Sequence, residues 1–142
     1  VYGPAGRPDM APLRFVRWID EGTPITLYGD GSQSRDFTYI DDIAFGTIAA
    51  LKNVGHEIVN LGGGNNPISI SKMIETFENQ LGEKAIINSQ PFIKADMLHT
   101  WADISKAESI LDWKPQVSFE EGTQRLVDWY RKEKDWVSQL TL

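Results

Sequence analysis

The sequence predicts an α/β fold with a small mixed sheet and covering helices, and two observations support this prediction. Short segments rich in β-branched and aromatic residues alternate with longer segments whose apolar residues recur every three or four positions. Glycine and proline separate these segments at short intervals. The sequence shows no repeat, linker or low-complexity stretch, so we expect one domain over residues 1–142.

Five helices are expected, each with an apolar side and a recognisable start or stop. Hydroxyl and carboxylate side chains begin most of them, and glycine ends two. The boundary residues are Pro12 and Gly22 for the first helix, Asp41 for the second, Ser69 or Ser71 with Gly82 for the third, Asp103 for the fourth, and a capping box of Ser118 and Glu121 for the fifth, which is expected to run to about Val137.

Four strands are expected between these helices, at residues 25–28, 37–40, 58–61 and 85–87. The third of them, Ile-Val-Asn-Leu, is of the short and buried type that parallel sheets contain. Residues 89–101 are expected to form an irregular crossing segment.

Composition excludes several classes of function. The chain has no cysteine and only two histidines, His56 and His99, which argues against disulfides, thiol chemistry and a zinc site. The net charge of −6 argues against nucleic acid and anionic membranes as partners. No apolar run approaches the roughly 20 residues that span a bilayer, and no leader opens the chain, so a soluble cytoplasmic protein is expected.

Residues 28–42 contain the most informative motif. A Gly-Asp-Gly turn at residues 29–31 follows an apolar strand, and Arg35 comes just before an aromatic segment. A guanidinium held beside a tight turn suits a phosphate, because it can bind two oxygens at once. The alternative is a surface hairpin in which Arg35 pairs with Asp30 or Asp36.

This motif and the opening segment, residues 1–12, together resemble the extended short-chain dehydrogenase/reductase family, the NAD-dependent epimerases and dehydratases of nucleotide sugars. Within it, the run VYGPAGRPDMA is most similar to the UDP-glucuronate 4-epimerases. In that family the glycine-rich NAD fingerprint and the catalytic Tyr-x-x-x-Lys precede this turn. Because the chain starts there, with Val1, we expect the C-terminal substrate-binding portion of an extended Rossmann-type enzyme without its NAD-binding part.

The resemblance implies a set of substrate-binding residues. The arginine that matches Arg35 grips the diphosphate of the nucleotide sugar, and the one that matches Arg7 also faces the substrate, so the two are expected to converge. Met10, Ala11 and Tyr28 match positions that pack or hydrogen-bond the uracil. Simple core packing is the alternative for Met10 and Tyr28.

Tyr2 and Pro4 match the Tyr-Gly-Pro turn, whose tyrosine lies near the nicotinamide of NAD in the family. We therefore expect Tyr2 to contact both substrate and cofactor, and Pro4 to fix the turn on the cofactor side of the site, although a second residue can also be frayed. A departure from the family pattern is Ile93, where many relatives place an arginine or glutamine. Gln90 or Lys94 is the candidate substitute.

Two further motifs are judged structural. The turn Gly62-Gly63-Gly64 follows a predicted strand, but its spacing does not fit a dinucleotide fingerprint. Tyr130 and Lys134 satisfy Tyr-x-x-x-Lys, yet they lie at the wrong end of the chain on a helix crowded with charges. We expect that helix face to be solvated.

The resemblance implies that the intact enzyme oxidises the sugar at C4 with NAD and returns the hydride to the other face, and that this chain alone is inactive. A dehydratase or decarboxylase of the same family, and a non-catalytic nucleotide-sugar-binding module, remain alternatives. A homodimer is expected. Trp129, Tyr130 and Trp136 are expected to pack in the core or, alternatively, at a dimer face. Strand 58–61 is expected to self-associate through an unpaired edge.

Overall fold

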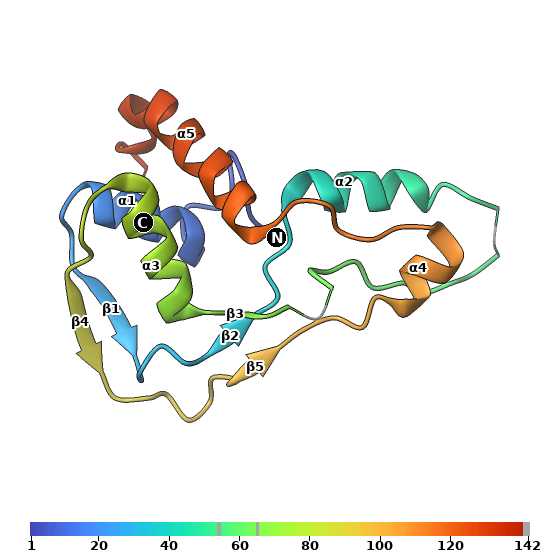
Figure 1. The fold of residues 1–142 in the computed structure, drawn as a ribbon, viewed down its shortest axis with the longest axis horizontal. Coiled ribbons are helices and arrows are strands. Elements are labelled where there is room, and N and C mark those ends of the chain that lie inside the picture. Colours follow the sequence, from blue (N-terminus) through green and yellow to red (C-terminus); the bar gives the residue numbers. More distant parts are fainter. Residues whose placement is uncertain (54, 65, 141–142) are drawn as a thin grey trace.

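The computed structural model describes residues 1–53, 55–64 and 66–140, and over these residues the chain has the expected α/β architecture (Figure 1). Helices and short strands alternate along most of it. The elements are α1 (Ala11–Asp20), β1 (Ile25–Tyr28), β2 (Ser34–Arg35), α2 (Ile40–Ala49), β3 (Ile68–Ser69), α3 (Ile70–Leu81), β4 (Ile87–Gln90), β5 (His99–Thr100), α4 (Ser105–Leu111) and α5 (Phe119–Val137).

The strands form two small sheets. In the first, β1 pairs in parallel with β4, with Tyr28 opposite Gln90. In the second, β2 lies between β3, which is antiparallel to it, and β5, which is parallel to it. The second sheet is therefore mixed, as expected, and it places Arg35 at its centre.

The main core lies where α1, α3 and α5 pack together, on the side of the molecule that carries β1 and β4 (Figure 1). Val16 from α1, Phe77 from α3 and Leu126 from α5 are fully buried there. Apolar spacing of three and four residues along each helix produces these inward faces. The core thus fixes α1 against β1, which is where the site described below lies.

A second, smaller cluster lies at the opposite end of the molecule, between α2 and α4 (Figure 1). Its buried residues are Ile104, Ala107, Leu111 and Trp113. The Trp113 indole N–H donates to the Asp42 backbone carbonyl at 2.9 Å, and the buried Asp42 carboxylate accepts from two backbone amides. These hydrogen bonds tie α2 to the segment that follows α4.

The predicted helices are confirmed, with small shifts at their starts. Ser69, rather than Ser71, caps α3 by accepting from the Lys72 amide at 3.1 Å, and Ser118 caps α5 in the same way. The Asp103 carboxylate accepts from the Ser105 amide at 2.9 Å. The prediction that Asp41 caps α2 is wrong, because the helix already begins at Ile40 and Asp41 lies in its first turn.

The strand at 25–28 is confirmed, but the other strand predictions need correction. Residues 37–40 form no strand; their only ladder contact in the described chain is a parallel bridge from Tyr39 to Tyr2. The strand expected at 85–87 begins only at Ile87 and runs to Gln90, as β4. Residues 58–61 are extended without a strand partner among the described residues, and Ile58 is exposed.

Candidate functional site

A hollow of about 490 Å³ lies between α1, β1 and β2. Its wall combines aromatic rings, two arginines and one carboxylate. The lining residues are Ala11, Arg14, Phe15, Trp18, Thr26, Leu27, Tyr28, Gln33, Arg35, Ile70 and Asp96. A concave surface with large apolar area and a few converging polar groups is the usual form of a small-molecule site.

The turn after β1 brings Arg35 back beside Tyr28. Gly29 and Gly31 have φ of +80° and +78°, the left-handed region that favours glycine. Between them, the Asp30 carboxylate accepts from the Ser32 amide at 2.9 Å. Hydrogen bonding from the Ser32 side chain, and then from this amide, lowers the pKa of Asp30. The Gly-Asp-Gly sequence therefore produces the sharp return that the motif predicted.

Arg35 is held in place by three acceptors. Its guanidinium donates to the backbone carbonyl of Ser34 at 2.9 Å, to that of Leu98 at 3.4 Å and to the Asp96 carboxylate at 2.7 Å. The surface pairing with Asp30 or Asp36, kept open above, does not occur. A guanidinium has five N–H donors, so these contacts leave donors for an oxygen anion in the hollow.

Aromatic side chains form the flat part of the wall. The Arg14 guanidinium carbon lies 4.2 Å from the centre of the Trp18 ring, within cation–π range. Phe15 and Trp18 are stacked with ring centres 6.3 Å apart. Tyr28 is partly exposed at the end of β1. Such faces suit a nucleobase, because every base presents a flat π surface.

The lining residues that were not singled out from the sequence include Arg14, Trp18, Gln33 and Asp96. Arg14 and Trp18 are four residues apart, so they share one face of α1, and this spacing was a usable signal. Gln33 is buried, and its amide nitrogen donates to the Tyr28 carbonyl at 2.6 Å. Asp96 reaches Arg35 from 61 residues away, which local spacing could not reveal.

Of the predicted substrate-binding residues, Ala11, Tyr28 and Arg35 line this hollow. Arg7 and Met10 instead line a much smaller hollow together with Tyr2. Arg7 is exposed and donates to the Asp9 carboxylate at 3.0 Å. The structure thus places Arg7 and Arg35 in separate hollows and does not bring them to one point.

Gln90 lies opposite Tyr28 in the first sheet, but neither Gln90 nor Lys94 is among the residues that line the larger hollow. Gln90 is exposed on β4, and its backbone carbonyl accepts from the Gly29 amide at 2.9 Å. Its side chain donates to Asn88 at 3.2 Å. A role for either residue in binding the substrate stays a prediction.

Tyr2 is a core residue in this chain. Its ring is buried against Tyr39 and Phe119, with edge contact to Tyr39 at a centre distance of 5.7 Å, and its hydroxyl donates to the Phe119 carbonyl at 3.3 Å. Burial raises the pKa of Tyr2. Its backbone pairs with Thr38 and Ile40, so the frayed alternative is wrong. Pro4 is half-buried beside it, and contact of either residue with a cofactor stays a prediction.

The Tyr-x-x-x-Lys pattern on α5 has a structural role, because both of its residues bind one carboxylate on α1. Tyr130 is fully buried, which agrees with core packing of the aromatic tail and differs from the solvated face expected for the Tyr-x-x-x-Lys pattern. Its hydroxyl donates to the Asp20 carboxylate at 2.9 Å. Lys134 binds the same carboxylate at 2.6 Å. Burial, and then the contact with Asp20, raises the pKa of Tyr130, whereas a catalytic tyrosinate requires a lowered pKa.

The glycine turn at residues 62–64 is packed against side chains of this chain. A Cβ on Gly63 would lie 2.1 Å from the Asp36 carboxylate, and one on Gly62 would lie 2.4 Å from the Ala102 Cβ. The glycines therefore allow a close internal contact, in agreement with the structural interpretation. Asn65, which follows them, lies outside the described residues.

Within the described ranges, no cluster of three or more acidic or histidine side chains could hold a metal ion. In the same ranges, no helix has the length and apolar character needed to cross a membrane.

Comparison with known proteins first gives the class. Residues 1–62 match the family described as "NAD dependent epimerase/dehydratase family". Solved neighbours of the fold include a UDP-glucuronic acid 4-epimerase from Bacillus cereus in complex with UDP-glucuronic acid and NAD, with a TM-score of 0.85 and 42% identity, covering 92% of this chain and 42% of that one. MoeE5 in complex with UDP-glucuronic acid and NAD gives a TM-score of 0.87 at 28% identity, covering 93% of this chain and 44% of that one.

More specifically, the chain is 56% identical to a UDP-glucuronate 4-epimerase of Thermodesulfobacterium geofontis, over 99% of this chain and 43% of that protein. It is 36% identical to UDP-glucuronate 4-epimerase 5 of Arabidopsis thaliana, over 96% of this chain and 37% of that protein. The chain therefore resembles the UDP-glucuronate 4-epimerases of this epimerase family, as its sequence motifs indicated. It spans less than half the length of these relatives.

Proposed function

We propose that the chain is the C-terminal, substrate-binding portion of a longer NAD-dependent nucleotide-sugar 4-epimerase whose substrate is UDP-glucuronate. The single observation that carries this proposal is the hollow in which Arg35 stands beside the aromatic wall of α1 and β1. Its support from relatives is the similarity to UDP-glucuronate 4-epimerases along nearly the whole chain.

In this proposal Arg35 binds the diphosphate of the nucleotide sugar. Its contacts with Ser34, Leu98 and Asp96 fix the direction of the guanidinium before the ligand arrives, so little side-chain entropy is lost on binding. Charge-assisted bonds to phosphate oxygens are about twice as strong as neutral ones. They would oppose the repulsion between an anionic ligand and a chain of net charge −6.

The base of the nucleotide would lie on the aromatic part of the wall, against Tyr28 and Trp18. Stacking on an aromatic side chain contributes roughly 1–3 kcal/mol per base. Arg14 lies over Trp18 and holds that ring in place. Sugar and base would thus lie on opposite sides of Arg35, with the sugar directed towards the part of the enzyme that this chain does not contain.

The described residues of this chain do not form a site for the pyrophosphate of NAD. The turn at residues 62–64 is filled by Asp36 and Ala102, which leaves no glycine cradle there. Tyr130 is buried with a raised pKa and cannot serve as the base. Solved relatives hold NAD, and we propose that the remainder of the longer protein binds it here. The chain alone is then inactive.

Homodimer formation and a cytoplasmic location stay proposals as well. For the dimer, the support is the pair Trp129 and Trp136 on α5, which meet edge to face at 5.8 Å with Trp136 partly exposed. Large aromatic side chains are enriched at protein interfaces. Sedimentation of the Trp136→Ser variant tests this: an unchanged oligomer would exclude a role for this pair.

The binding proposal is tested by calorimetric titration of the 142-residue chain with UDP. Replacement of Arg35 by alanine is expected to weaken binding roughly tenfold to a hundredfold, because one or two charge-assisted bonds of roughly 1.5–3 kcal/mol are lost. Arg35→Lys keeps the positive charge but loses the two-pronged guanidinium, so its affinity for UDP should lie between those of the unchanged chain and Arg35→Ala. Lys132→Ala, on the exposed side of α5, is the charge-matched control. Equal affinity of Arg35→Ala and Lys132→Ala would overturn the proposal.

A further inference from the structure

Helix α1 contacts two different parts of the molecule. Arg14 and Trp18 line the larger hollow. Two other residues of its last turns, Arg17 and Asp20, bind α5 instead. Figure 1 shows the end of α5 beside α1. The part of α1 that carries Trp18 is therefore held from behind by α5.

The Arg17 guanidinium closes the C-terminal end of α5. It donates to the backbone carbonyls of Ser138 and Leu140, each at 2.8 Å, and to that of Val137 at 3.4 Å. The last carbonyls of a helix have no partner within the helix, so a cation there both satisfies them and interacts favourably with the helix dipole. Glu21 accepts from the same guanidinium at 2.9 Å and fixes its direction. The Arg17 side chain is only 14% exposed, so water competes little for these bonds.

Asp20 joins the same two helices by a separate contact. Its carboxylate accepts from the Tyr130 hydroxyl at 2.9 Å and from the Lys134 ammonium at 2.6 Å. These donors are four residues apart on α5 and therefore share one face of it. Arg17 and Asp20 together attach the last turn of α1 along the C-terminal part of α5.

A helix as short as α1 needs such attachments. It has ten residues, and isolated helices shorter than about 12–15 residues are marginal in water. Gly22, with a φ of +66°, follows its last turn at once. Trp18 lies between Arg17 and Asp20 in this turn, and its ring stacks on Phe15. Any loosening of the turn would therefore move the Trp18 ring.

We propose that Arg17 and Asp20 are positioning residues for nucleotide binding. Through the end of α5 they hold the last turn of α1, so that Trp18 presents a fixed flat face to the base. The inference rests on the proposed function, because it takes the aromatic wall as the place of the base. It adds that residues 134–140 affect nucleotide binding without touching the ligand. Arg35 is held by the second sheet and does not depend on this contact.

The test compares the binding of UDP with that of inorganic pyrophosphate, which has no base, by calorimetric titration of the 142-residue chain. Arg17→Met keeps the length of the side chain and removes its donors. We expect it to weaken UDP binding about tenfold, because stacking on the base is lost, and to leave pyrophosphate binding unchanged. Arg17→Lys can still donate to the carbonyls and should restore most of the UDP affinity. An equal fall in both affinities, or no fall in either, would overturn the proposal.

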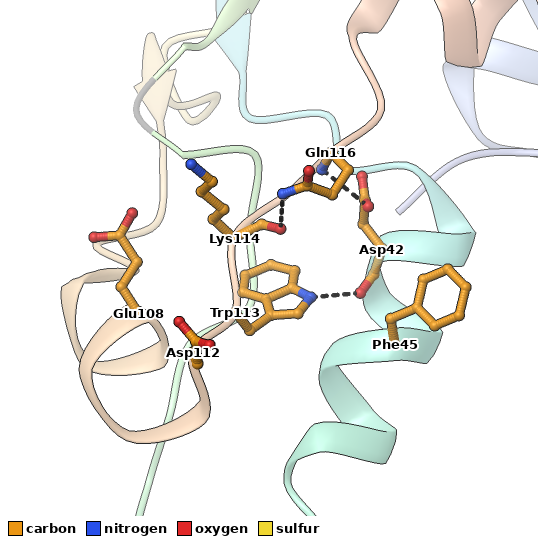
Figure 2. Close-up of a pocket in the computed structure, with 7 residues that line it drawn as sticks. All are labelled: Asp42, Phe45, Glu108, Asp112, Trp113, Lys114 and Gln116. Atoms are coloured by element: carbon orange, nitrogen blue, oxygen red, sulfur yellow. Dashed lines mark hydrogen bonds between the residues drawn. The ribbon is translucent and has the colours of Figure 1, made fainter.

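Asp42→Asn is the control for a general loss of stability. Asp42 lies at the other end of the molecule, where its carboxylate accepts from backbone amides of the segment after α4 (Figure 2). This variant should lower Tm without changing the ratio of UDP affinity to pyrophosphate affinity. A ratio that falls in Asp42→Asn as it does in Arg17→Met would assign the effect to stability, and the proposal would be wrong.

Fluorine NMR of the chain labelled with fluorotryptophan observes the Trp18 ring directly. The chain has five tryptophans, and loss of one signal in Trp18→Phe assigns the signal of interest. Arg17→Met should shift or broaden that signal in the free protein, whereas Asp42→Asn should not. Tyr130→Phe removes a single hydroxyl from the Asp20 contact and should act in the same direction as Arg17→Met, which keeps the test decisive if Arg17→Met does not fold.

The outcomes separate this inference from the proposed function. If the unchanged chain does not bind UDP, the proposed function fails and the inference fails with it. If UDP binds, but the Trp18 signal and the UDP affinity are the same in the unchanged chain, Arg17→Met and Tyr130→Phe, the inference alone is wrong.

Discussion

Asp42 should contribute more to the stability of this chain than its neighbour Asp41, although both lie in the first turn of α2. The Asp42 carboxylate is 2% exposed and accepts from the Gln116 and Val117 amides, each at 3.0 Å. In Asp42→Asn one of these amides loses its acceptor and faces an NH₂ donor, while the other keeps only a neutral bond. Hydrogen bonds to charged groups contribute roughly 1.5–3 kcal/mol, and a buried unpaired group costs about 1–3 kcal/mol. We expect destabilisation by about 2–4 kcal/mol.

Asp41→Asn is the matched control. It removes the same charge from the same helix turn, so the loss of about 0.3–1 kcal/mol of helix-dipole interaction is common to both variants. Within the part of the chain that the structure describes, Asp41 otherwise forms only an exposed pair with Arg125 at 3.3 Å, which contributes about 0–1 kcal/mol. Urea unfolding and thermal melting of both variants give the comparison; Asp42→Asn should lower Tm by roughly 4–12 °C. Equal loss in the two variants would refute the importance of the buried hydrogen bonds.

Three further predictions concern the core, the pH dependence of stability and the site. Gly122→Ala should lower the free energy of unfolding, measured in urea, by about 1–3 kcal/mol, because the new Cβ would clash with the Tyr2 hydroxyl. At an exposed helical glycine the same change would stabilise the protein, so a stabilised variant would contradict the packing described. The Glu78 carboxylate accepts from Lys84 and the Ala85 amide, and these bonds lower its pKa below the ordinary 4.5. The stabilisation that Glu78 provides is therefore present above about pH 4.5 and is lost as pH falls through the lowered pKa. Glu78→Gln should thus flatten the fall in Tm between pH 6 and pH 3. Asp96→Asn should weaken UDP binding less than Arg35→Ala does, because Asp96 acts only by orienting the guanidinium; a larger effect of Asp96→Asn in calorimetry would show that it contacts the ligand itself.

The helices could be predicted because their signals are local. Ser69 and Ser118 start α3 and α5 as their sequence positions indicated, and Gly82 ends α3 with a φ of +80°. The strands were less predictable, because a strand requires a partner that sequence pattern alone does not supply. Residues 37–40 have β-favouring side chains, yet the helix begins at Ile40, and residues 58–61 have no neighbouring strand in the described chain.

The candidate site was predictable only in part, for the same physical reason. Arg35 and Tyr28 belong to one turn motif, so their proximity followed from the sequence. Asp96 reaches the hollow from a distant segment, and nothing in its local spacing indicated this contact. Arg7 and Arg35 were expected together by resemblance, but the structure places them in separate hollows.

The most direct test of the central claim is turnover of UDP-glucuronate by the longer protein in which this chain is joined to the unmatched part of the Thermodesulfobacterium geofontis relative. We predict that it forms UDP-galacturonate with NAD, that Arg35→Ala raises KM by about tenfold or more, and that the 142 residues alone are inactive. A longer protein that folds and binds NAD but leaves UDP-glucuronate unchanged would contradict the account, and so would turnover by the 142-residue chain alone.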